Sequence, residues 1–572
     1  MTTSTPDCIR AYRPPQHGAP IDLDLSGGER TTECAELPDL LAGFGPDILR
    51  RYPHARDLEL QFAERIGVAA SSVYVTAGAD EAIDRVCRAQ LGPGDSAVCP
   101  WPCFEMIPRY VALAGARLHR VDWTEGAFPI QAILDQAEAR TRLVVAVSPN
   151  NPTGAVVHAA EIERLARSLP SALVLVDQAY SEFAATDLTA AVLRFPNVVV
   201  TRTLSKAWGL AGLRVGFAIG RPEVIDQMRA AGGPYSVSGP SLFIAGRALE
   251  CGEAAKAAYV SEVRDERTRL EKLAPSLAWT CQPSQGNFVL WRGSRSAWLR
   301  DGLAGMGVAV RVFPAVDSLA DAVRITCPGD GGRYRRLERA LRTVLRPQAV
   351  LFDMDGVLAD VSASYRAAIV ATARAFAVEL RAEEIDAEKM LGDANDDWAL
   401  THRMLRKRGV HVSLENVTRC FEAYYQGHSG RPGLRATESL LTSRRILERL
   451  RERVRLGIVT GRPRQDALRF LSEHGLEGVF DTVVCREDAP LKPDPAPLRL
   501  AMSRLSERGD TCERAWYVGD TLDDVKAARA AAVVPLGVVA PGSQAAVVGP
   551  LLLASGAARI LERLEQLEEL LP

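Results

Sequence analysis

Strand-like apolar runs alternate with amphipathic helical stretches along most of the chain, and this alternation constrains the fold more than any other feature. The runs include VVAV, LVLV and NVVV in the first half and AVLFD, GIVTG and WYVGD in the second. Such alternation is typical of parallel sheets covered by helices. The series occurs twice, and an Arg-rich helical stretch between the two ends at Arg346-Pro347. We therefore predict two α/β domains, residues 1–347 and 348–572.

Length and composition limit the classes of function. The 572 residues are too many for one core, and the net charge of -2 gives no reason to expect a nucleic acid or an anionic membrane as partner. The first residues lack the apolar core of a signal peptide, and the longest apolar run is too short to span a membrane. The 11 cysteines form no CxxC pair, which argues against a zinc site or a disulfide framework. We expect a cytoplasmic protein that acts on small molecules.

Three motifs in the first half fit one cofactor. SPNNPTG stands at 148–154, LVLVDQAY at 173–180 and TRTLSKAWGLAGLRVG at 201–216. Each alone is more typical of a turn, a helix cap or a solvated lysine. Pyridoxal phosphate needs a lysine to bind it, an acid at its ring nitrogen and donors at its phenolic oxygen. Lys206, Asp177 and the pair Asn151 and Tyr180 supply these in that order.

The phosphate of this cofactor also finds candidate ligands. A phosphate needs small hydroxyls, backbone amides at a helix start and a cation. Thr203, Ser205 and Arg214 lie close to Lys206 in the sequence, and GADE at 78–81 predicts a helix start at Ala79 and Asp80. Together with the three motifs, these residues predict a binding site for pyridoxal phosphate.

The first 345 residues resemble the fold-type I aminotransferases, and within them the histidinol-phosphate aminotransferase family. The resemblance covers roughly residues 10–345 and includes RYP at 51–53, PCFEM at 102–106, GNFVL at 286–290 and VRIT at 323–326. It implies a large and a small α/β domain, a homodimer and five further site residues. These are Phe104 stacked on the cofactor ring, Tyr52 reaching the neighbour's cofactor phosphate, Arg324 binding the substrate carboxylate, Arg311 binding a substrate phosphate and Tyr12 closing over the substrate.

Two segments depart from that family. LSGGER at 25–30 stands where an Asn-rich SNENP stretch is usual, and PYSVSG at 234–239 stands where PYNVN is usual. Both segments lie near the substrate in the family. The sequence therefore supports the chemistry more strongly than the substrate.

A second set of motifs begins with VLFDMDGVLAD at 350–360. By itself, Asp-x-Asp-Gly is as typical of a strand that ends in an acidic turn. Thr460, Lys492 and the pair Asp520 and Asp524 follow in LGIVTGRP, DAPLKPDP and WYVGDTLDDVKAA. In this order the motifs resemble the haloacid dehalogenase superfamily, subfamily IA, over residues 348–572. The resemblance implies a Rossmann-like core with a helical cap.

Phosphoryl transfer assigns a role to each of these residues. Asp353 is the expected nucleophile and Asp355 the expected general acid and base. Thr460 and Lys492 are expected to bind the phosphoryl oxygens. We expect Mg²⁺ to be held by Asp353, Asp520 and the backbone carbonyl of Asp355, with Asp524 as a supporting acid. The presence of Asp355 favours a phosphatase over a dehalogenase.

The helical cap is expected at about residues 361–450. A lid at this point of the fold implies a small substrate. Within it, Asp393, Asp396, Asp397 and Trp398 are expected on the cap surface, with contacts to the substrate as the alternative.

The joining of the two domains suggests consecutive reactions: transamination of a phosphorylated carbonyl compound, then dephosphorylation of the amine. The conversion of imidazole-acetol phosphate to histidinol phosphate and then to histidinol fits both halves. Three alternatives remain open: the same two activities on another phosphorylated metabolite, a pyridoxal-phosphate decarboxylase joined to a phosphatase, and a non-catalytic module in either half.

Overall fold

The apolar runs of the first half form one seven-stranded sheet. The computed structural model describes residues 17–33, 37–389, 392, 396–428, 430–507 and 511–572. In spatial order the strands are β2 (Val73–Thr76), β8 (Gly216–Ile219), β7 (Val198–Thr203), β6 (Leu173–Asp177), β5 (Thr141–Val147), β3 (Ser96–Trp101) and β4 (Arg117–Asp122). β8 runs antiparallel to both neighbours, whereas β7, β6, β5, β3 and β4 pair in parallel.

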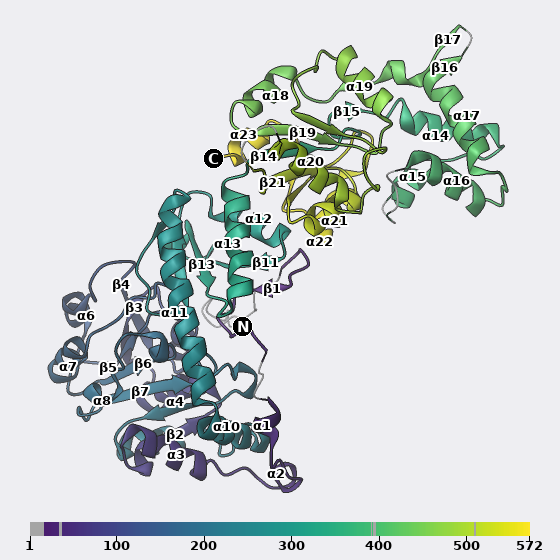
Figure 1. Cartoon of the computed structure of the whole chain (residues 1–572). Coiled ribbons are helices and arrows are strands. Elements are labelled where there is room, and N and C mark those ends of the chain that lie inside the picture. The colour runs from purple at the N-terminus through teal and green to yellow at the C-terminus, as the bar shows by residue number, and fades with distance from the viewer. Residues whose placement is uncertain (1–16, 34–36, 390–391, 393–395, 429, 508–510) are drawn as a thin grey trace, which may run out of the picture. The chain divides into compact units, whose positions relative to one another are not determined.

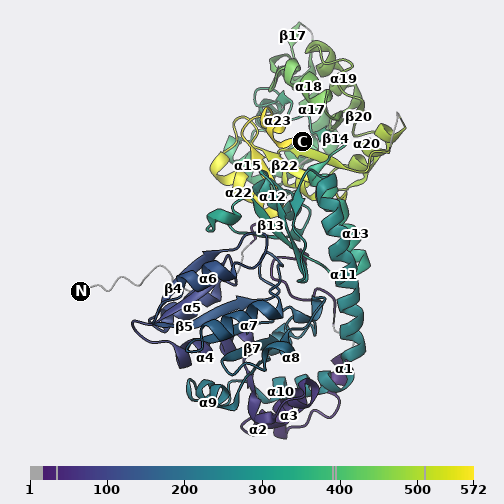
Figure 2. The same ribbon diagram turned by 90° about the vertical axis from the view of Figure 1, so that its left-hand side faces the viewer.

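Both faces of this sheet are buried, which explains why its strands are apolar throughout. In β5, Leu143 and Val145 point into one core cluster, whereas Val144 and Ala146 point into the other. One face is covered by α4 (Gly78–Gln90), α5 (Met106–Leu113) and α9 (Pro222–Ala230). The other face is covered by α3 (Arg56–Ile66), α7 (Ala159–Ser168) and α10 (Gly239–Cys251), as Figure 2 shows from the side. The shorter helices are α1 (Leu37–Leu41), α2 (Asp47–Arg50), α6 (Ile130–Gln136) and α8 (Thr189–Val192).

A long helix, α11 (Glu253–Ser276), leads to a smaller antiparallel sheet. Its strands lie in the order β12 (Arg311–Val312), β13 (Ala322–Thr326), β10 (Phe288–Arg292) and β9 (Thr280–Cys281). Arg311 stands directly opposite Arg324 in the register of β12 and β13. A separate two-stranded pair joins β1 (Leu23–Asp24) and β11 (Val308–Ala309). The small sheet therefore brings both predicted substrate arginines together.

The second half forms a six-stranded sheet whose strands are all parallel. Its order is β20 (Thr482–Val484), β19 (Arg455–Val459), β14 (Ala349–Phe352), β21 (Ala515–Gly519), β22 (Val534–Val538) and β23 (Arg559–Leu561). The accompanying helices are α18 (Arg444–Arg451), α19 (Arg464–Glu473), α20 (Ala496–Ser506), α21 (Leu522–Ala530), α22 (Ala545–Ser555) and α23 (Gln566–Leu570). Asp353, Thr460 and Asp520 each follow the last residue of a strand, so they meet at one edge of the sheet.

Four helices are inserted between β15 (Ala359–Asp360) and β18 (Ser439–Leu440), two short strands that pair with each other. They are α14 (Tyr365–Ala375), α15 (Ala382–Lys389), α16 (Asp397–Lys407) and α17 (Leu414–Gln426), followed by the hairpin β16 (Gly427–His428) and β17 (Arg431–Pro432). Figure 1 shows α14, α16 and α17 grouped beside the sheet. These helices form a cap within the predicted range 361–450, although α18 at the end of that range packs against β19 of the core.

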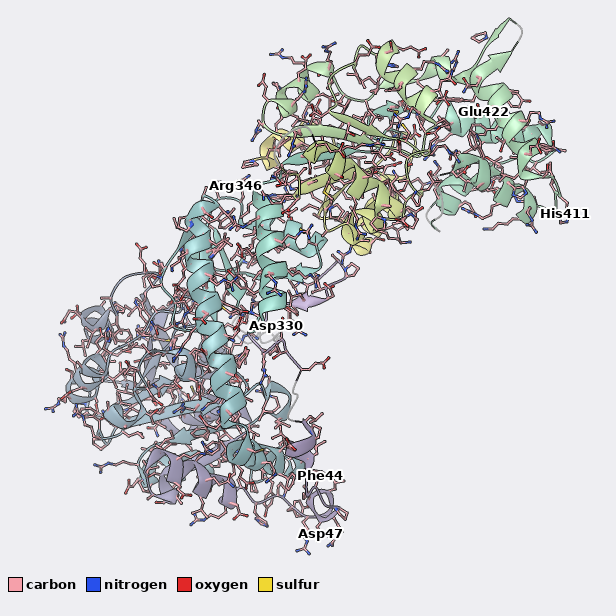
Figure 3. All side chains as sticks on the ribbon, viewed as in Figure 1. Phe44, Asp47, Asp330, Arg346, His411 and Glu422 are labelled. Atoms are coloured by element: carbon pink, nitrogen blue, oxygen red, sulfur yellow. The ribbon has the colours of Figure 1, made fainter. Side chains whose placement is uncertain are left out.

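The compact units of the chain change over within the small α/β region, between residues 296 and 336, and not at residue 347. One unit contains Asp24–Ser296 and Val310–Arg335, and the other contains Ala297–Ala309 and Arg336–Pro572. Most of α12 (Ser296–Gly305) and residues 336–345 of α13 (Gly331–Leu345) therefore belong to the second unit. Asp330 and Arg346, which flank α13, are labelled in Figure 3. The physical reason is local: the rings of Trp298 and Trp516 meet edge to face at 4.9 Å, and Trp516 Nε1 donates to the Thr343 carbonyl at 2.9 Å.

The predicted fold class, α/β throughout with a capped Rossmann-like second domain, is confirmed. Among the described residues, no helix combines the length and the apolar character that crossing a membrane requires.

Candidate active sites

A cavity of about 400 Å³ opens in the first unit, where the strands of the seven-stranded sheet end. It gathers twelve of the residues that the sequence singled out: Ala79, Asp80, Phe104, Asn151, Asp177, Tyr180, Thr203, Ser205, Lys206, Arg214, Arg311 and Arg324. They come from segments far apart in the chain, so the fold brings the predicted set together.

Asp177, the last residue of β6, is a buried acid at this cavity. Its Oδ1 accepts hydrogen bonds from Thr201 Oγ1 at 3.1 Å and from the Ala179 amide at 3.3 Å. Burial raises the pKa of Asp177 to about 6, although the Thr201 hydrogen bond opposes the shift. A protonated ring nitrogen beside this carboxylate would offset the burial, so Asp177 fits the acid that pyridoxal phosphate needs.

Lys206 and Tyr180 lie next to the LSGGER segment. Lys206 Nζ is 5.5 Å from the centre of the Tyr180 ring. Gly28 has a φ of +78°, and a Cβ added there would stand 3.6 Å from Lys206 Nζ and 3.7 Å from the Tyr180 hydroxyl. Ser26, Gly27 and Glu29 line the same cavity. One segment that departs from the family therefore lies against the predicted catalytic lysine.

A cradle for an anion forms at the start of α4. Thr203 Oγ1 donates to Ser205 Oγ at 2.8 Å, and Arg214 Nη1 lies 3.5 Å from the same oxygen. Arg214 is held in turn by the Asp80 carboxylate at 2.9 Å. A Cβ on Gly216 would meet the Ala79 amide nitrogen at 2.5 Å, so β8 packs tightly on the first turn of the helix. Hydroxyls, a guanidinium and a helix N-terminus suit a phosphate.

Two arginines occupy the substrate end of this cavity. Arg324 is buried and donates to Asn151 Oδ1 at 2.7 Å and to the Ser26 carbonyl at 2.5 Å. Arg311 instead forms an ion pair with Glu105, at 3.0 Å. Because Glu105 compensates its charge, Arg311 would have to share or leave this partner to bind a phosphate. Sequence reasoning did not identify Glu105, although it lies inside PCFEM.

Tyr52 does not line the cavity. The side chain of Tyr52 is 76% exposed and stacks on Tyr235 with ring centres 5.1 Å apart. Tyr235 belongs to PYSVSG, the other segment that departs from the family. The role of Tyr52 in a neighbouring subunit stays a prediction, and Tyr12 lies outside the described residues.

The second unit carries a cluster of acids at the edge of the six-stranded sheet. Carboxylate oxygens of Asp353, Asp520 and Asp524 all lie within 4.8 Å of one another. Burial raises the pKa of Asp353 well above its ordinary value, against the attraction of Lys492. Burial and the Asp524 charge raise the pKa of Asp520 to about 7. A divalent cation would offset both penalties, and oxygen ligands suit Mg²⁺.

Asp524 is already fully engaged by its neighbours. Its Oδ1 accepts from Lys492 Nζ at 2.6 Å and from the Tyr517 hydroxyl at 2.9 Å. Its Oδ2 accepts from the Thr521 hydroxyl at 2.6 Å and from the Thr521 amide at 2.9 Å. Asp524 therefore fits the role of a supporting acid that fixes Lys492.

Lys492 and Thr460 are buried beside the predicted nucleophile. Lys492 Nζ is 3.0 Å from Asp353 Oδ1. Burial lowers the pKa of Lys492, but Asp353 and Asp524 outweigh it and the net shift is upward. The Thr460 hydroxyl accepts a hydrogen bond from the Arg462 amide at 3.1 Å. Neither Lys492 nor Thr460 lines the small cavity at this edge, so contact with a phosphoryl group stays a prediction.

Arg462, which sequence reasoning missed, holds the predicted general acid. Its Nε and Nη2 lie 2.6 Å and 2.5 Å from Asp355 Oδ1. Its Nη1 donates to Glu438 at 2.9 Å, and Glu438 also accepts from Ser364 and Tyr425 at the base of the cap. The available signal was position, since Arg462 follows Thr460 by two residues in TGRP. Among the described residues, Arg462 contacts Oδ1 of Asp355, and the proposed reaction uses Oδ2.

The cap contributes side chains to the small cavity, whose volume is about 40 Å³. Core residues Asp353, Asp355 and Asp520 line it together with Arg366, Lys389 and Asp397 from the cap. The expectation that Asp397 lies on the cap surface is wrong: its side chain is only 14% exposed and lies 3.3 Å from Lys389 Nζ. The alternative, contact with the substrate, fits this position.

The neighbours of Asp397 have other contacts. Asp396 caps α16, accepting from the amides of Trp398 and Ala399, and pairs with Arg486 at 3.0 Å. Trp398 Nε1 donates to Glu422, labelled in Figure 3, at 3.1 Å. Asp393 lies outside the described residues.

Comparison with known proteins identifies both halves of the chain. The family model for aminotransferase class I and II matches residues 46–342, and the model for haloacid dehalogenase-like hydrolase matches residues 350–538. Histidinol-phosphate aminotransferase of Sinorhizobium meliloti, solved in complex with pyridoxal-5'-phosphate, shares the fold with a TM-score of 0.53 at 23% identity, over 60% of this chain and 98% of that one.

Three curated relatives of this chain are named for three different activities. Imidazoleglycerol-phosphate dehydratase of Phytophthora nicotianae is 44% identical over 37% of this chain, which spans half of that protein (50%). Aromatic amino acid aminotransferase of Mycobacteroides abscessus is 33% identical over 58% of this chain and 97% of that protein. Histidinol-phosphate aminotransferase 1 of Thiobacillus denitrificans is 32% identical over 60% of this chain and 94% of that protein.

These matches agree with the two cavities, each of which lies in a matched region. The chain is a fused enzyme: it belongs to the aminotransferase class I and II family and carries a haloacid dehalogenase-like hydrolase domain after the aminotransferase domain.

Proposed function

We propose that the chain transaminates a small phosphorylated carbonyl compound in the first cavity and hydrolyses the phosphate ester of the resulting amine at the second. The proposal rests on one observation: Lys206 and Asp353, the two predicted reactive groups, each lie close to the side chains that their reactions need. Lys206 shares a cavity with Asp177, Tyr180 and Asn151. Asp353 lies beside Lys492 and within a cluster of acids.

At the first site, pyridoxal phosphate would withdraw electrons from the substrate carbon that carries the amino group. Asp177 would keep the proton on the ring nitrogen, and the cradle of Thr203, Ser205 and Arg214 would hold the phosphate. Lys206 Nζ would take the proton from the substrate's α-carbon and return it to a different position. Arg324, fixed by Asn151 and Ser26, would bind the carboxylate of an amino donor.

At the second site, a carboxylate oxygen of Asp353 would attack phosphorus and form an acyl phosphate, while the ester bond to the leaving oxygen breaks. Asp355 Oδ2 would give its proton to that oxygen. In the second half of the reaction, Asp355 would take a proton from water, which attacks the acyl phosphate and releases inorganic phosphate. Asp353, Asp520 and the backbone carbonyl of Asp355 would hold Mg²⁺, which lowers the cost of the negative charge.

We propose imidazole-acetol phosphate as the first substrate, converted to histidinol phosphate and then to histidinol. Support comes from relatives whose names refer to histidinol phosphate and imidazoleglycerol phosphate. We also propose a cytoplasmic homodimer in which Tyr52 reaches the partner's cofactor phosphate, with no nucleic-acid or membrane partner. Other phosphorylated metabolites remain candidates because LSGGER lies against Lys206.

A second candidate substrate for the aminotransferase is an aromatic amino acid. Arg311 is paired with Glu105, and the apolar side chains of Phe313, Val316 and Leu319 line the cavity. A relative at 33% identity is named for this activity. In that case the hydrolase domain would act on an unrelated ester.

A substrate panel for the full chain separates these possibilities. Histidinol phosphate, histidinol, phenylalanine and phosphorylated amino acids would each be offered as amino donor with 2-oxoglutarate, and glutamate formation measured. The proposal predicts the highest kcat/KM for a phosphate ester. A higher kcat/KM for phenylalanine would replace it by the aromatic candidate, and release of CO₂ would indicate a decarboxylase.

A further inference from the structure

Three charged side chains of the cap line the small cavity in the hydrolase domain: Arg366 of α14, and a cation and an anion that we call its roof, Lys389 and Asp397. Lys389 is the last residue of α15, and Asp397 is the first residue of α16. Their side chains are 16% and 14% exposed, and Lys389 Nζ lies 3.3 Å from Asp397 Oδ1. Both line the cavity that contains Asp353, Asp355 and Asp520. Two opposite charges thus face the predicted nucleophile.

The position of Asp397 is fixed by contacts that its neighbour makes. Asp396 accepts hydrogen bonds from the amides of Trp398 and Ala399 and so caps α16. The Asp396 carboxylate also pairs with Arg486 at 3.0 Å, and the Arg486 guanidinium lies 4.3 Å from the centre of the Trp398 ring. Asp396 therefore accounts for the anchoring of the helix start, whereas the Asp397 carboxylate is left to face the cavity.

The small size of the cavity limits which atoms of a substrate can contact the roof while the phosphoryl group lies near Asp353. A volume of about 40 Å³ corresponds to only a few water-sized positions, since one water needs roughly 10–15 Å³ measured in this way. With a phosphoryl group near Asp353, the next atoms of the substrate would lie against Lys389 and Asp397. The roof would therefore contact substituents one or two carbons from the ester oxygen.

We propose that this roof recognises a phosphate ester with an ammonium group two carbons from the ester oxygen. Asp397 would pair with the ammonium, and Lys389 would pair with a phosphoryl oxygen. Each charge of the substrate would thus lie against a roof residue of opposite charge. The present contact of Lys389 Nζ with Asp397 shows that this carboxylate can receive an ammonium group.

The consequence is an order of reactions, and it rests on the proposed phosphatase activity of Asp353. A 2-oxo ester offers no cation, so Lys389 would have to compensate both the phosphoryl group and the Asp397 carboxylate in a water-poor cavity. The phosphatase would therefore select the 2-amino ester, the class of product that transamination of a 2-oxo ester supplies. Hydrolysis before transamination would be disfavoured by the cap itself.

The test compares 2-aminoethyl phosphate with 2-hydroxyethyl phosphate on the full chain with Mg²⁺, with phosphate release as the readout. Wild-type protein should prefer the amine by about ten- to a hundredfold in kcat/KM, the scale of one charge-assisted hydrogen bond. Asp397→Asn should remove the preference by lowering kcat/KM for the amine, and Asp397→Glu should restore part of it. Glu415→Gln is the control, because Glu415 is an exposed carboxylate of the cap that does not line the cavity, and it should change neither ester.

The outcomes separate this inference from the proposed activity. Asp353→Asn should abolish hydrolysis of both esters; if it does not, the phosphatase assignment fails. If Asp353→Asn behaves as expected but wild-type protein treats the two esters alike, or Asp397→Asn lowers both equally in a protein with an unchanged melting temperature, the recognition of the amine is wrong.

Discussion

The two cavities of this chain differ in size and in the charged groups that they offer to a substrate. The aminotransferase cavity is about 400 Å³ and offers arginines, each already held by a protein acceptor such as Asp80 or Glu105. The hydrolase cavity is about 40 Å³, and its charged lining consists of four aspartates together with Lys389 and Arg366 from the cap. A large cavity must hold a cofactor together with a substrate, whereas the small one has room for a phosphoryl group and little more. Under the proposed function, we expect substrate choice to depend on the arginine partners at the first site and on the cap at the second.

The largest expected effect tests whether the two sites are independent. Lys206→Ala should lower transamination by on the order of a thousandfold or more and leave phosphate release from added histidinol phosphate unchanged, because the lysine moves the proton in the first cavity only. Asp353→Asn should do the reverse, because an amide is not a nucleophile. Each variant would be assayed for glutamate formation and for phosphate release. Loss of both activities in either folded variant would contradict two independent sites.

Removal of divalent cations should affect only the acid-lined site. A chelator should lower phosphate release by about a hundredfold or more, and added Mg²⁺ should restore it. Transamination should not change, since its predicted groups include no cluster of carboxylates. A phosphatase activity that survives chelation would show that Asp353 and Asp520 do not need a cation.

Arg462 sharpens the comparison because it connects the general acid with the base of the cap. Arg462→Gln should lower hydrolysis of an alkyl phosphate by about ten- to a hundredfold, part of the 10²–10⁴ that general acid catalysis contributes. The initial burst of p-nitrophenol from p-nitrophenyl phosphate should change little, because this leaving group departs without a proton and the burst precedes the step in which Asp355 acts as a base. Arg462→Lys, which keeps the charge, is the control. Equal losses on both esters would mean that Arg462 only supports the fold.

Arg311 gives the smallest expected effect, at the first site. Arg311→Ala should weaken transamination of histidinol phosphate by about ten- to a hundredfold and leave histidinol nearly unchanged. Glu105→Gln should strengthen binding of the phosphate ester, because it removes the competing carboxylate 3.0 Å from Arg311. Arg324→Ala should instead weaken every donor that carries a carboxylate. Equal effects of Arg311→Ala on the two compounds would favour the aromatic substrate.

The site residues that lie at the end of a strand could be predicted from the sequence. Asp177, Asp353 and Asp520 each close or follow a buried parallel strand, and strands in one sheet end at a common edge. Ser205 and Lys206 could be predicted for the same reason, because they follow the end of β7 in the same sheet.

Residues whose position depends on long-range side-chain packing could not be predicted. Glu105 reaches Arg311, and Glu438 reaches Arg462, only once separate elements are in place. Asp397 stands in an acidic stretch whose composition is that of a solvated surface, and only the fold of the cap turns it inward. The grouping of Ala297–Ala309 with the hydrolase domain likewise depends on the contact of Trp298 with Trp516.

The central claim is that one chain first transaminates a phosphorylated carbonyl compound and then removes its phosphate. The most direct test follows phosphate release from imidazole-acetol phosphate, with and without glutamate as amino donor. With the donor, phosphate release should become about ten- to a hundredfold faster after a lag in which histidinol phosphate accumulates, and Lys206→Ala should show only the slow release under either condition. Equal rates of phosphate release with and without glutamate would contradict the account.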